Sequence, residues 1–199
     1  DANGTTLASL ARACGVEARL LGIAPDRPRA LEAKLGRAAG SDVLLLSGGV
    51  SVGEYDLVPS LLRGRGFREV CWGVSIKPGR PVFLGRRGRQ VVFALPGNPV
   101  ACVVVFELLV RPYLDAISGR SVVGRVPLQA RLVGDLRVRP GRRQLLRARL
   151  EARGVTLEVR PYAAQKSGVL RSLTASNALI DLADDVSHLP DGSTVRAAG

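Results

Sequence analysis

Hydrophobic and polar residues alternate along the first part of the chain with periods that predict helices and strands in turn. Helices are expected where apolar residues recur at helical spacing, at residues 5–13, 27–39, 57–65 and 99–116. Strands are expected from short apolar runs at residues 16–23, 42–47, 70–76, 82–84 and 91–95. This alternation predicts an α/β domain with a largely parallel sheet.

The pattern changes near residue 119 to short, Arg-rich alternating segments separated by turns such as Pro140-Gly141 and Arg153-Gly154. Short strands are expected at residues 145–150, 155–159, 178–182 and 194–196. Several short strands with turn signals predict a small all-β domain of barrel or sandwich type. We therefore expect an α/β domain over residues 1–120 and a β domain over residues 121–199.

Charge adds an expectation about the ligand. The 199-residue chain has 26 Arg, 3 Lys and 17 acidic residues, and its net charge is +12. Residues 1–120 carry 16 basic and 10 acidic groups and residues 121–199 carry 13 and 7, so each half is +6 and neither is a basic tail. This surplus favours an anionic partner, either nucleic acid or a phosphorylated small molecule.

Three further features limit the class of protein. The longest apolar run, residues 100–110, is interrupted by Glu107 and is too short to span a bilayer, so no membrane partner is expected. Cys14, Cys71 and Cys102 lie far apart among apolar residues, which favours buried thiols in a reducing, cytoplasmic compartment over disulfides or a zinc site. The chain starts at Asp1 and contains no Met, which indicates a fragment or a cut domain.

The first candidate site follows the apolar run at residues 42–47. It combines glycines, hydroxyls and carboxylates, namely Ser47, Gly48, Gly49, Ser51, Gly53, Glu54 and Asp56. Glycines let backbone N–H groups approach an anion, and hydroxyls donate hydrogen bonds to phosphate. Two carboxylates would repel that phosphate, so a bridging Mg²⁺ is the natural solution. A cap on the helix that begins at Leu57 is an alternative role for Asp56, and the two roles are compatible.

A second candidate loop is rich in proline and positive charge. It consists of Lys77, Pro78, Gly79, Arg80 and Pro81. The prolines fix one backbone bend and the two cations stand beside it, which suits phosphate or molybdate but equally an ordinary solvated turn.

The third candidate loop precedes the helix expected at residues 99–116 and consists of Pro96, Gly97, Asn98 and Pro99. Asn98 is expected to cap that helix, with Pro99 in its first turn and free N–H groups directed at a ligand. Ligands of open α/β sheets bind at the carboxyl ends of the strands. All three loops follow apolar runs, so we expect them to converge on one pocket for a phosphorylated ligand.

Several common kinds of active site are absent. His188 is the only histidine and lies near the C-terminus, so catalysis by a Ser-His-Asp or Cys-His group is not expected. The sequence has no Walker loop and no Gly-x-Gly-x-x-Gly motif. The chemistry is therefore expected to rest on positioning, a metal ion and electrostatics.

Taken together, these motifs resemble those of a known family. Residues 47–56, 77–81 and 95–99 resemble, in order and spacing, the C-terminal half of the molybdopterin molybdenumtransferases, a family that includes the gephyrin E domain. Asp1-Ala-Asn3, the stretch before Asp26, and the segments around Arg142, Arg147 and Asn177 extend the resemblance over essentially the whole chain. It implies a three-layer α/β/α molybdopterin-binding (MogA-like) domain followed by a small C-terminal barrel-like β domain.

The resemblance also implies an activity and roles for particular residues. The activity is the insertion of molybdate into adenylated molybdopterin with Mg²⁺ and release of AMP, by a homodimer of the full-length protein. Asp56 and Asp26 would be the catalytic acidic residues near the metal and the molybdate. Gly48, Gly49, Ser51 and Gly53 would hold the phosphate. The pocket lining would include Lys77, Pro78, Arg80, Pro96 and Pro99.

Parts of the family pattern are missing, and other functions remain open. Two upstream domains, a Gly-Asp-Glu segment and the usually central first strand of the α/β domain are not found. A molybdopterin adenylyltransferase shares the α/β fold, but its loop reads Gly-Gly-Thr-Gly where this chain has Val50-Ser51. Nucleic-acid binding by the arginines between residues 137 and 153 is disfavoured, because an aromatic content of 4% leaves few stacking platforms. A peptide-binding scaffold is a third alternative.

Overall fold

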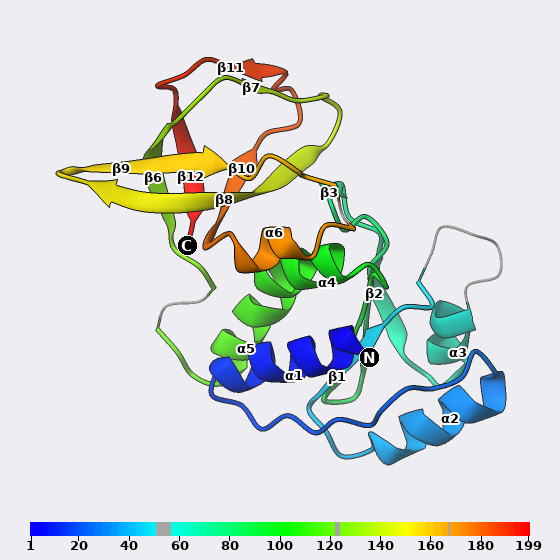
Figure 1. Cartoon of the computed structure of the whole chain (residues 1–199). Coiled ribbons are helices and arrows are strands. Elements are labelled where there is room, and N and C mark those ends of the chain that lie inside the picture. The colour runs from blue at the N-terminus through cyan, green and yellow to red at the C-terminus, as the bar shows by residue number, and fades with distance from the viewer. Residues whose placement is uncertain (51–56, 122–123, 167) are drawn as a thin grey trace. The chain divides into compact units, whose positions relative to one another are not determined.

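The computed structural model describes residues 1–50, 57–121, 124–166 and 168–199 (Figure 1). The chain divides into two compact units: Asp1–Val74 with Gly79–Ser121, and Ser75–Pro78 with Val122–Gly199. The short segment Ser75–Pro78, which the sequence pattern assigns to the α/β domain, thus groups with the second unit.

A four-stranded sheet in the order β1-β5-β4-β2 lies at the centre of the first unit. Its strands are β1 (Val43–Ser47), β2 (Arg68–Trp72), β4 (Phe83–Arg87) and β5 (Gln90–Leu95). Only β1 and β5 run parallel among these four, since β4 is antiparallel to both β5 and β2. The expectation of a largely parallel sheet is therefore wrong for the described strands. Gly88 and Arg89 leave room for a hairpin turn between β4 and β5, whereas a parallel crossover needs a dozen or more residues.

Helices cover both faces of this sheet. They are α1 (Ala2–Ala13), α2 (Pro28–Arg37), α3 (Leu57–Gly64), α4 (Pro99–Val105), the π-helix η1 (Phe106–Val110) and α5 (Arg111–Ile117). Leu35 of α2 and Leu62 of α3 share a hydrophobic core with Val92 and Ala94 of β5. Phe93, whose side chain alternates to the opposite face, packs with its ring centroid 5.5 Å from that of Tyr113 in α5. The first unit is thus a three-layer α/β/α arrangement (Figure 1).

Residues 16–23 form no strand, contrary to the expectation from their apolar run. Leu21 packs against the core, but Leu20 and Ile23 are 49% and 68% exposed. Within the described residues this segment pairs with no strand, and β1 is paired only on its β5 side. An apolar run forms a stable strand only when a partner strand satisfies its backbone.

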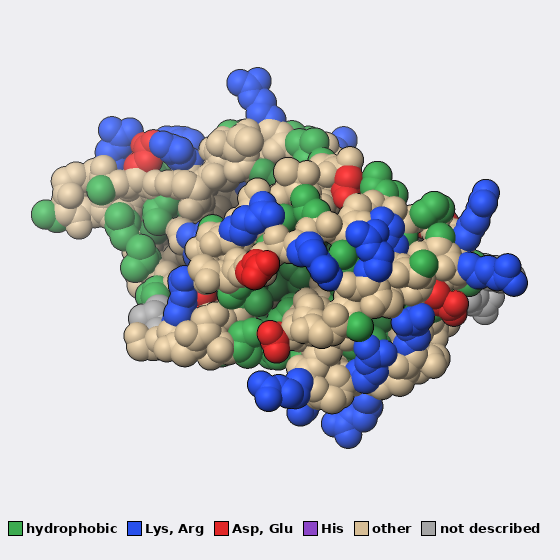
Figure 2. Space-filling view, turned by 90° about the horizontal axis from the view of Figure 1, so that it is seen from below, with side chains coloured by type: hydrophobic (Ala, Val, Ile, Leu, Met, Phe, Trp, Pro, Cys, Tyr) green, Lys and Arg blue, Asp and Glu red, His purple; other side chains and the backbone are tan. Residues whose placement is uncertain are grey.

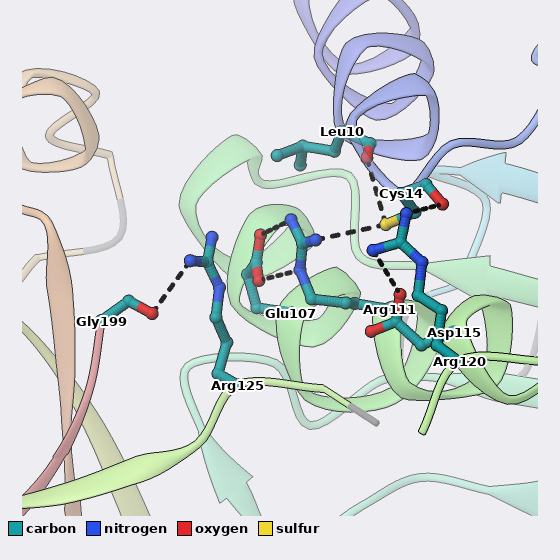
Figure 3. A network of polar contacts seen from close by, with 8 residues as sticks. All are labelled: Leu10, Cys14, Glu107, Arg111, Asp115, Arg120, Arg125 and Gly199. Atoms are coloured by element: carbon teal, nitrogen blue, oxygen red, sulfur yellow. Dashed lines mark hydrogen bonds and ion pairs between the residues drawn. The ribbon is translucent and has the colours of Figure 1, made fainter. Parts of the chain in front are cut away.

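A polar network joins the end of α1 to the helix that runs from η1 into α5 (Figure 3). Arg111 donates two hydrogen bonds to the Glu107 carboxylate, at 2.6 and 2.9 Å, and a third to the Cys14 sulfur at 3.3 Å. Arg120 donates to the backbone carbonyl of Cys14 at 2.8 Å. Burial raises the pKa of the Cys14 thiol. The network therefore links a neutral thiol at the end of α1 to a charge pair within the helix that runs from η1 into α5.

The second unit is a small β barrel. It contains β3 (Ile76–Lys77), β6 (Pro127–Leu132), β7 (Leu136–Arg137), β8 (Arg143–Arg153), β9 (Thr156–Pro161), β10 (Ala178–Leu182), β11 (His188–Leu189), β12 (Thr194–Ala198) and the helix α6 (Arg171–Thr174). The sheet runs β10-β12-β6-β9-β8-β3, and a further pairing of β10 with β8 closes it. Leu132, Leu146, Val159 and Ile180 lie in its core. The barrel-like C-terminal fold is therefore as expected, with β6, β7 and β11 as additional strands.

The arginines of this unit do not form a continuous basic face. Arg147 is 1% exposed, and its Nε and Nη2 bind the Ser172 hydroxyl and the backbone carbonyls of Ala164 and Lys166. Burial lowers its pKa. Arg143 instead pairs with Asp181 at 2.7 Å. The side chains of β8 are thus divided between the interior and ion pairs, which weakens the alternative of nucleic-acid binding.

Within the described ranges, every helix is too short or too polar to cross a lipid bilayer.

Candidate functional site

Two of the three candidate loops leave neighbouring strands at the same edge of the first sheet. β1 ends at Ser47 and β5 ends at Leu95, and these residues lie opposite each other in the parallel register. The N–H of Gly48 donates to the carbonyl of Leu95 at 3.0 Å. This edge is the carboxyl end of the parallel pair, where open α/β sheets bind their ligands.

The side chain of Asn3 links these two loops. Its Nδ2 donates to Ser47 Oγ at 2.7 Å and to the Gly97 carbonyl at 2.8 Å. Asn3 lies in the first turn of α1, which Asp1 caps by accepting a hydrogen bond from the Gly4 N–H at 2.8 Å. Asn3 is not among the site residues expected from the sequence. The signals available were its place in the Asp1-Ala-Asn3 segment of the family resemblance and in the first turn of a helix, and neither reveals its partners.

Ser47 lies at the centre of this arrangement. Besides accepting from Asn3, its hydroxyl donates to the Pro96 carbonyl over a long 3.4 Å contact. The thiol of Cys102 donates to the same oxygen at 3.7 Å. Burial raises the pKa of Cys102 to about 11, so this thiol is a neutral neighbour of the site.

Glycine is required where the two loops meet. A Cβ atom on Gly97 would lie 3.3 Å from the Cα of Gly48, so any side chain there would press the two backbones apart. Gly48 and Gly49 have φ angles of +86° and +68°, which other residues rarely adopt. On Gly49, a Cβ atom would lie 2.5 Å from a methyl carbon of Val58.

Asn98 caps α4, as expected from the third loop. Its Oδ1 accepts hydrogen bonds from the N–H groups of Val100 and Ala101 at 3.1 and 3.3 Å, and Pro99 is the first helical residue. The expectation that free N–H groups point toward the ligand needs correction, because the cap already binds these two. The groups of this loop that lie nearest Ser47 and Asn3 are the backbone carbonyls of Pro96 and Gly97.

The second candidate loop is divided between the two units. Lys77 belongs to the second unit, where it pairs with Gln144 of β8, and its peptide bond to Pro78 is cis. Gly79, Arg80 and Pro81 belong to the first unit, where the Arg80 carbonyl accepts from the Val74 N–H at 3.0 Å. The convergence of this loop with the other two therefore stays a prediction.

The acidic residues give a partial picture of the metal site. Asp26 is exposed, and within the described part of the chain it takes part in no hydrogen bond or ion pair. Four further candidates lie outside the described residues: Ser51, Gly53, Glu54 and Asp56. Among the described residues, no group of three or more His, Cys, Asp or Glu side chains is placed to hold a metal ion. The Mg²⁺ site expected at Asp26 and Asp56 thus stays a prediction.

Paired glycine loops on an α/β sheet, followed by a small β barrel, define a two-part ligand-binding protein. Residues 1–116 match the family model described as "Probable molybdopterin binding domain", and the chain belongs to this family. Residues 129–198 match the model described as "MoeA C-terminal region (domain IV)". The resemblance to the molybdopterin molybdenumtransferases and the fold class that it implies are thereby confirmed.

Individual relatives agree with the family models. The chain is 32% identical over 202 residues to a Mycobacterium tuberculosis protein named Molybdopterin molybdenumtransferase 2, which covers 98% of the chain and 49% of that protein. It is 33% identical over 151 residues to the Drosophila melanogaster Molybdenum cofactor synthesis protein cinnamon, covering 75% and 25% of the two chains. The crystal structure of a molybdopterin biosynthesis MoeA protein from Pyrococcus horikosii superimposes with a TM-score of 0.82 at 29% identity, covering 98% and 47%. The chain thus spans half or less of the length of these relatives.

Proposed function

We propose that this chain is the pterin-binding C-terminal half of a molybdopterin molybdenumtransferase, which inserts molybdate into adenylated molybdopterin and releases AMP. The observation that supports this most directly is the meeting of the two glycine loops after β1 and β5, joined by Asn3. Relatives that bear the transferase name align over nearly the whole chain. On this proposal, residues 1–120 bind the pterin and residues 121–199 form the accessory β domain.

The phosphate of the substrate is proposed to bind at Ser47 and Gly48. Because Asn3 already donates to Ser47 Oγ, the serine's own proton is available to an acceptor. Its present acceptor, the Pro96 carbonyl, is 3.4 Å away, longer than the usual 2.7–2.8 Å or so of a strong O–H···O bond. A phosphate oxygen can replace this weak contact without cost to the fold.

Magnesium is proposed to bind between the substrate and the carboxylates of Asp26 and Asp56. Oxygen donors are the ligands that Mg²⁺ prefers, and it commonly takes one or two carboxylates and completes its shell with water and substrate phosphate. The exposed Asp26 carboxylate, without a hydrogen-bond or ion-pair partner in the described part of the chain, fits this chemistry. A homodimer of the full-length protein and a cytoplasmic location are part of the same proposal.

Calorimetric titration of molybdopterin into this chain, with and without Mg²⁺, tests the proposed pocket. We expect binding that weakens in Asn3→Ala, because that change releases both loops from each other. Arg160→Gln, an exposed charge change on β9 of the second unit, is the matched control and should bind like the unmodified chain. Equal binding by Asn3→Ala would place the pterin elsewhere. If the folded chain binds nothing, repeating the titration with the full-length protein decides whether upstream residues are needed.

The role of Asp56 is best tested in the full-length enzyme. Asp56→Asn keeps the shape of the side chain but removes its negative charge, so we expect metal-dependent release of AMP to fall by at least about tenfold without loss of folding. Activity is followed by AMP formation at increasing Mg²⁺, and folding by thermal denaturation. Full activity in this variant would remove Asp56 from the mechanism.

A further inference from the structure

The first unit has a second polar site, at the end of its sheet opposite the glycine loops. An open pocket of about 390 Å³ is lined by Gly66, Arg68, Arg86, Arg87 and Gly88. Arg87 pairs with Gln90, where β5 begins, whereas the glycine loops follow the end of β5 at Leu95. Five residue steps of about 3.3 Å along a strand separate the two places by roughly 17 Å. The pocket is therefore distinct from the candidate pterin site.

Two like charges face each other in this pocket. Arg68 of β2 and Arg86 of β4 are direct partners in the antiparallel register. Directly opposite residues have Cβ atoms about 4.5–5.5 Å apart on the same face, and equal charges at such positions destabilise the sheet. Within the described part of the chain, neither arginine forms an ion pair with a carboxylate. Arg68 and Arg86 therefore form an unfavourable contact between like charges.

Nearby carboxylates do not relieve this repulsion. Glu69, the next residue of β2, points to the other face and binds Arg63, whose Nε donates to it at 2.9 Å. The barrel of the second unit provides a comparison, because Arg149 and Arg160 are also direct cross-strand partners there. In that pair, Arg149 lies 3.3 Å from the carboxylate of Glu151. The pair in the pocket lacks such an internal anion.

The third arginine of the lining, Arg87, follows Arg86 directly in β4, so its side chain leaves the strand on the face opposite the pair, where uncharged groups hold it. Arg87 lies with its guanidinium carbon 4.7 Å from the centroid of the Phe67 ring. Its two terminal nitrogens donate to the Arg65 carbonyl at 3.2 Å and to Gln90 Oε1 at 3.1 Å. These partners orient the cation but leave its charge uncompensated. Preorganised positive charge is what distinguishes a binding site from solvated surface charge.

Positive charge alone does not mark this place as special. Figure 2 shows Lys and Arg side chains standing over much of one face of the molecule, with acidic side chains scattered among them. The pocket differs from such a surface in combining a concave lining with a cross-strand arginine pair that no carboxylate offsets, and an anchored third arginine, on the other face of β4, completes its rim. Its remaining lining residues, Gly66 and Gly88, leave the backbone accessible and add no side chain that would fill the space.

We propose that this pocket binds a small, multiply charged phosphate anion of the pyrophosphate type. Guanidinium groups match phosphate oxygens with paired N–H donors, and one anion between Arg68 and Arg86 converts their repulsion into two attractions. The small volume suits a free anion of a few atoms better than a polymer. This site is independent of the proposed pterin pocket.

Calorimetric titration of inorganic pyrophosphate into the chain, at near-physiological salt and without Mg²⁺, tests the proposal. We expect binding that weakens by at least about tenfold in the double variant Arg68→Gln/Arg86→Gln. Arg160→Gln, which removes one arginine of the compensated pair in the barrel, should change the affinity by less than about twofold. No binding by the folded chain, or the same loss in the control as in the double variant, would overturn the proposal.

Further titrations separate the possible sources of the signal. ATP binding as tightly as pyrophosphate would identify a nucleotide as the source of the phosphate, whereas pyrophosphate alone would identify the inorganic anion. Equal affinity for citrate, or tighter binding of duplex DNA, would show that phosphate of this size is not selected and would overturn the proposal. Asn3→Ala should leave pyrophosphate binding intact, while the double arginine variant should keep molybdopterin binding, so the two sites fail separately.

One substitution tests the physical basis directly. Arg86→Glu replaces the cross-strand repulsion by an ion pair with Arg68, so its thermal midpoint without anion should rise while pyrophosphate binding is lost. A fall in the midpoint together with retained binding would contradict the assignment of these two arginines.

Discussion

At the scale of single residues, the candidate pterin site depends on how closely two backbones can approach. Gly48 and Gly97 meet at a distance that leaves no room for a side chain, and Asn3 bonds to both of their loops. None of these three residues carries a charge. The described part of the candidate site around these three residues therefore consists of uncharged hydrogen-bond donors and acceptors.

Gly97→Ala tests this close approach. The added Cβ would stand 3.3 Å from the Cα of Gly48, a backbone atom, so we expect the free energy of unfolding to fall by about 1–3 kcal/mol. Gly36→Ala in α2 is the matched control, because its Cβ meets nothing within 4 Å. Removing a helical glycine should stabilise by roughly 0.5–1 kcal/mol. Urea denaturation measures the free energy of unfolding of both variants. Equal changes in the same direction would refute the packing argument.

Burial of Cys102 makes the free energy of unfolding depend on pH. Its folded pKa is about 11 because of burial, whereas the reference value is 9.0. The folded chain thus holds the thiol proton more tightly than the unfolded chain does, so this stabilisation is complete below pH 9 and is lost as the pH rises toward 11. We expect a loss of up to about 2–3 kcal/mol over this window that is absent from Cys102→Ala. Urea denaturation at pH 9 and at pH 11 measures the free energy of unfolding of the unmodified chain and of Cys102→Ala. Equal losses in the two proteins would contradict this role of Cys102.

At the scale of elements, hydrogen bonds from Arg111 and Arg120 to Cys14, at the end of α1, join α1 to the helix that follows the third loop. Glu107 lies in the π-helical segment η1 and Arg111 in the first turn of α5, so their bond spans the change of helix type (Figure 3). Hydrogen bonding to Glu107 raises the pKa of Arg111. Asn3 lies in the first turn of α1 and Cys14 follows its last turn. The network at the C-terminal end of α1 therefore helps to position Asn3 at its N-terminal end.

Arg111→Met should lower the free energy of unfolding by about 3 kcal/mol, because it removes the bidentate partner of a carboxylate that is only 11% exposed. Adding Glu107→Gln should restore part of the loss. The exposed pair Arg63 and Glu69 provides the comparison, since Arg63→Met should cost no more than about 1 kcal/mol. A double-mutant cycle on both pairs measures the difference, and equal coupling energies would show that burial is not the cause.

At the scale of the whole molecule, the two units have separate hydrophobic cores. One core gathers residues of α2, α3 and the first sheet, and the other consists of barrel residues such as Leu132 and Ile180. Each unit also has its own polar anchor, the half-buried Arg111 in the first and the buried Arg147 in the second. Because the cores are separate, a destabilising substitution in one unit should lower the stability of that unit and leave the other largely unchanged.

Arg147→Met should destabilise the barrel by about 2–3 kcal/mol, because it leaves the Ser172 hydroxyl and two backbone carbonyls without their donor. Amide hydrogen exchange should show lost protection in β10 and unchanged protection in β5. The fluorescence of Trp72, the only tryptophan, reports the first unit. Molybdopterin binding should also be retained, and a large loss of binding would show that the pocket extends to Arg147.

Local patterns were sufficient for much of the fold and part of the site. The glycine loops after β1 and β5, the Asn98 cap and the strand at residues 178–182 were all predicted from sequence. These features depend on residues close together in the chain, through φ preference, capping chemistry and alternation. The choice of a molybdopterin-related function over the alternatives rested on the resemblance of these motifs, in order and spacing, to a known family.

Only the tertiary structure decided which distant segments become partners. The apolar run at residues 16–23 pairs with no described strand and so forms none, and β4 is antiparallel because of its two-residue turn to β5. The amide of Asn3 and the buried guanidinium of Arg147 acquire their roles from residues far along the sequence. The sequence by itself determined the chemical groups and their local geometry, whereas pairing and burial, which are set by contacts between remote segments, determined where those groups act.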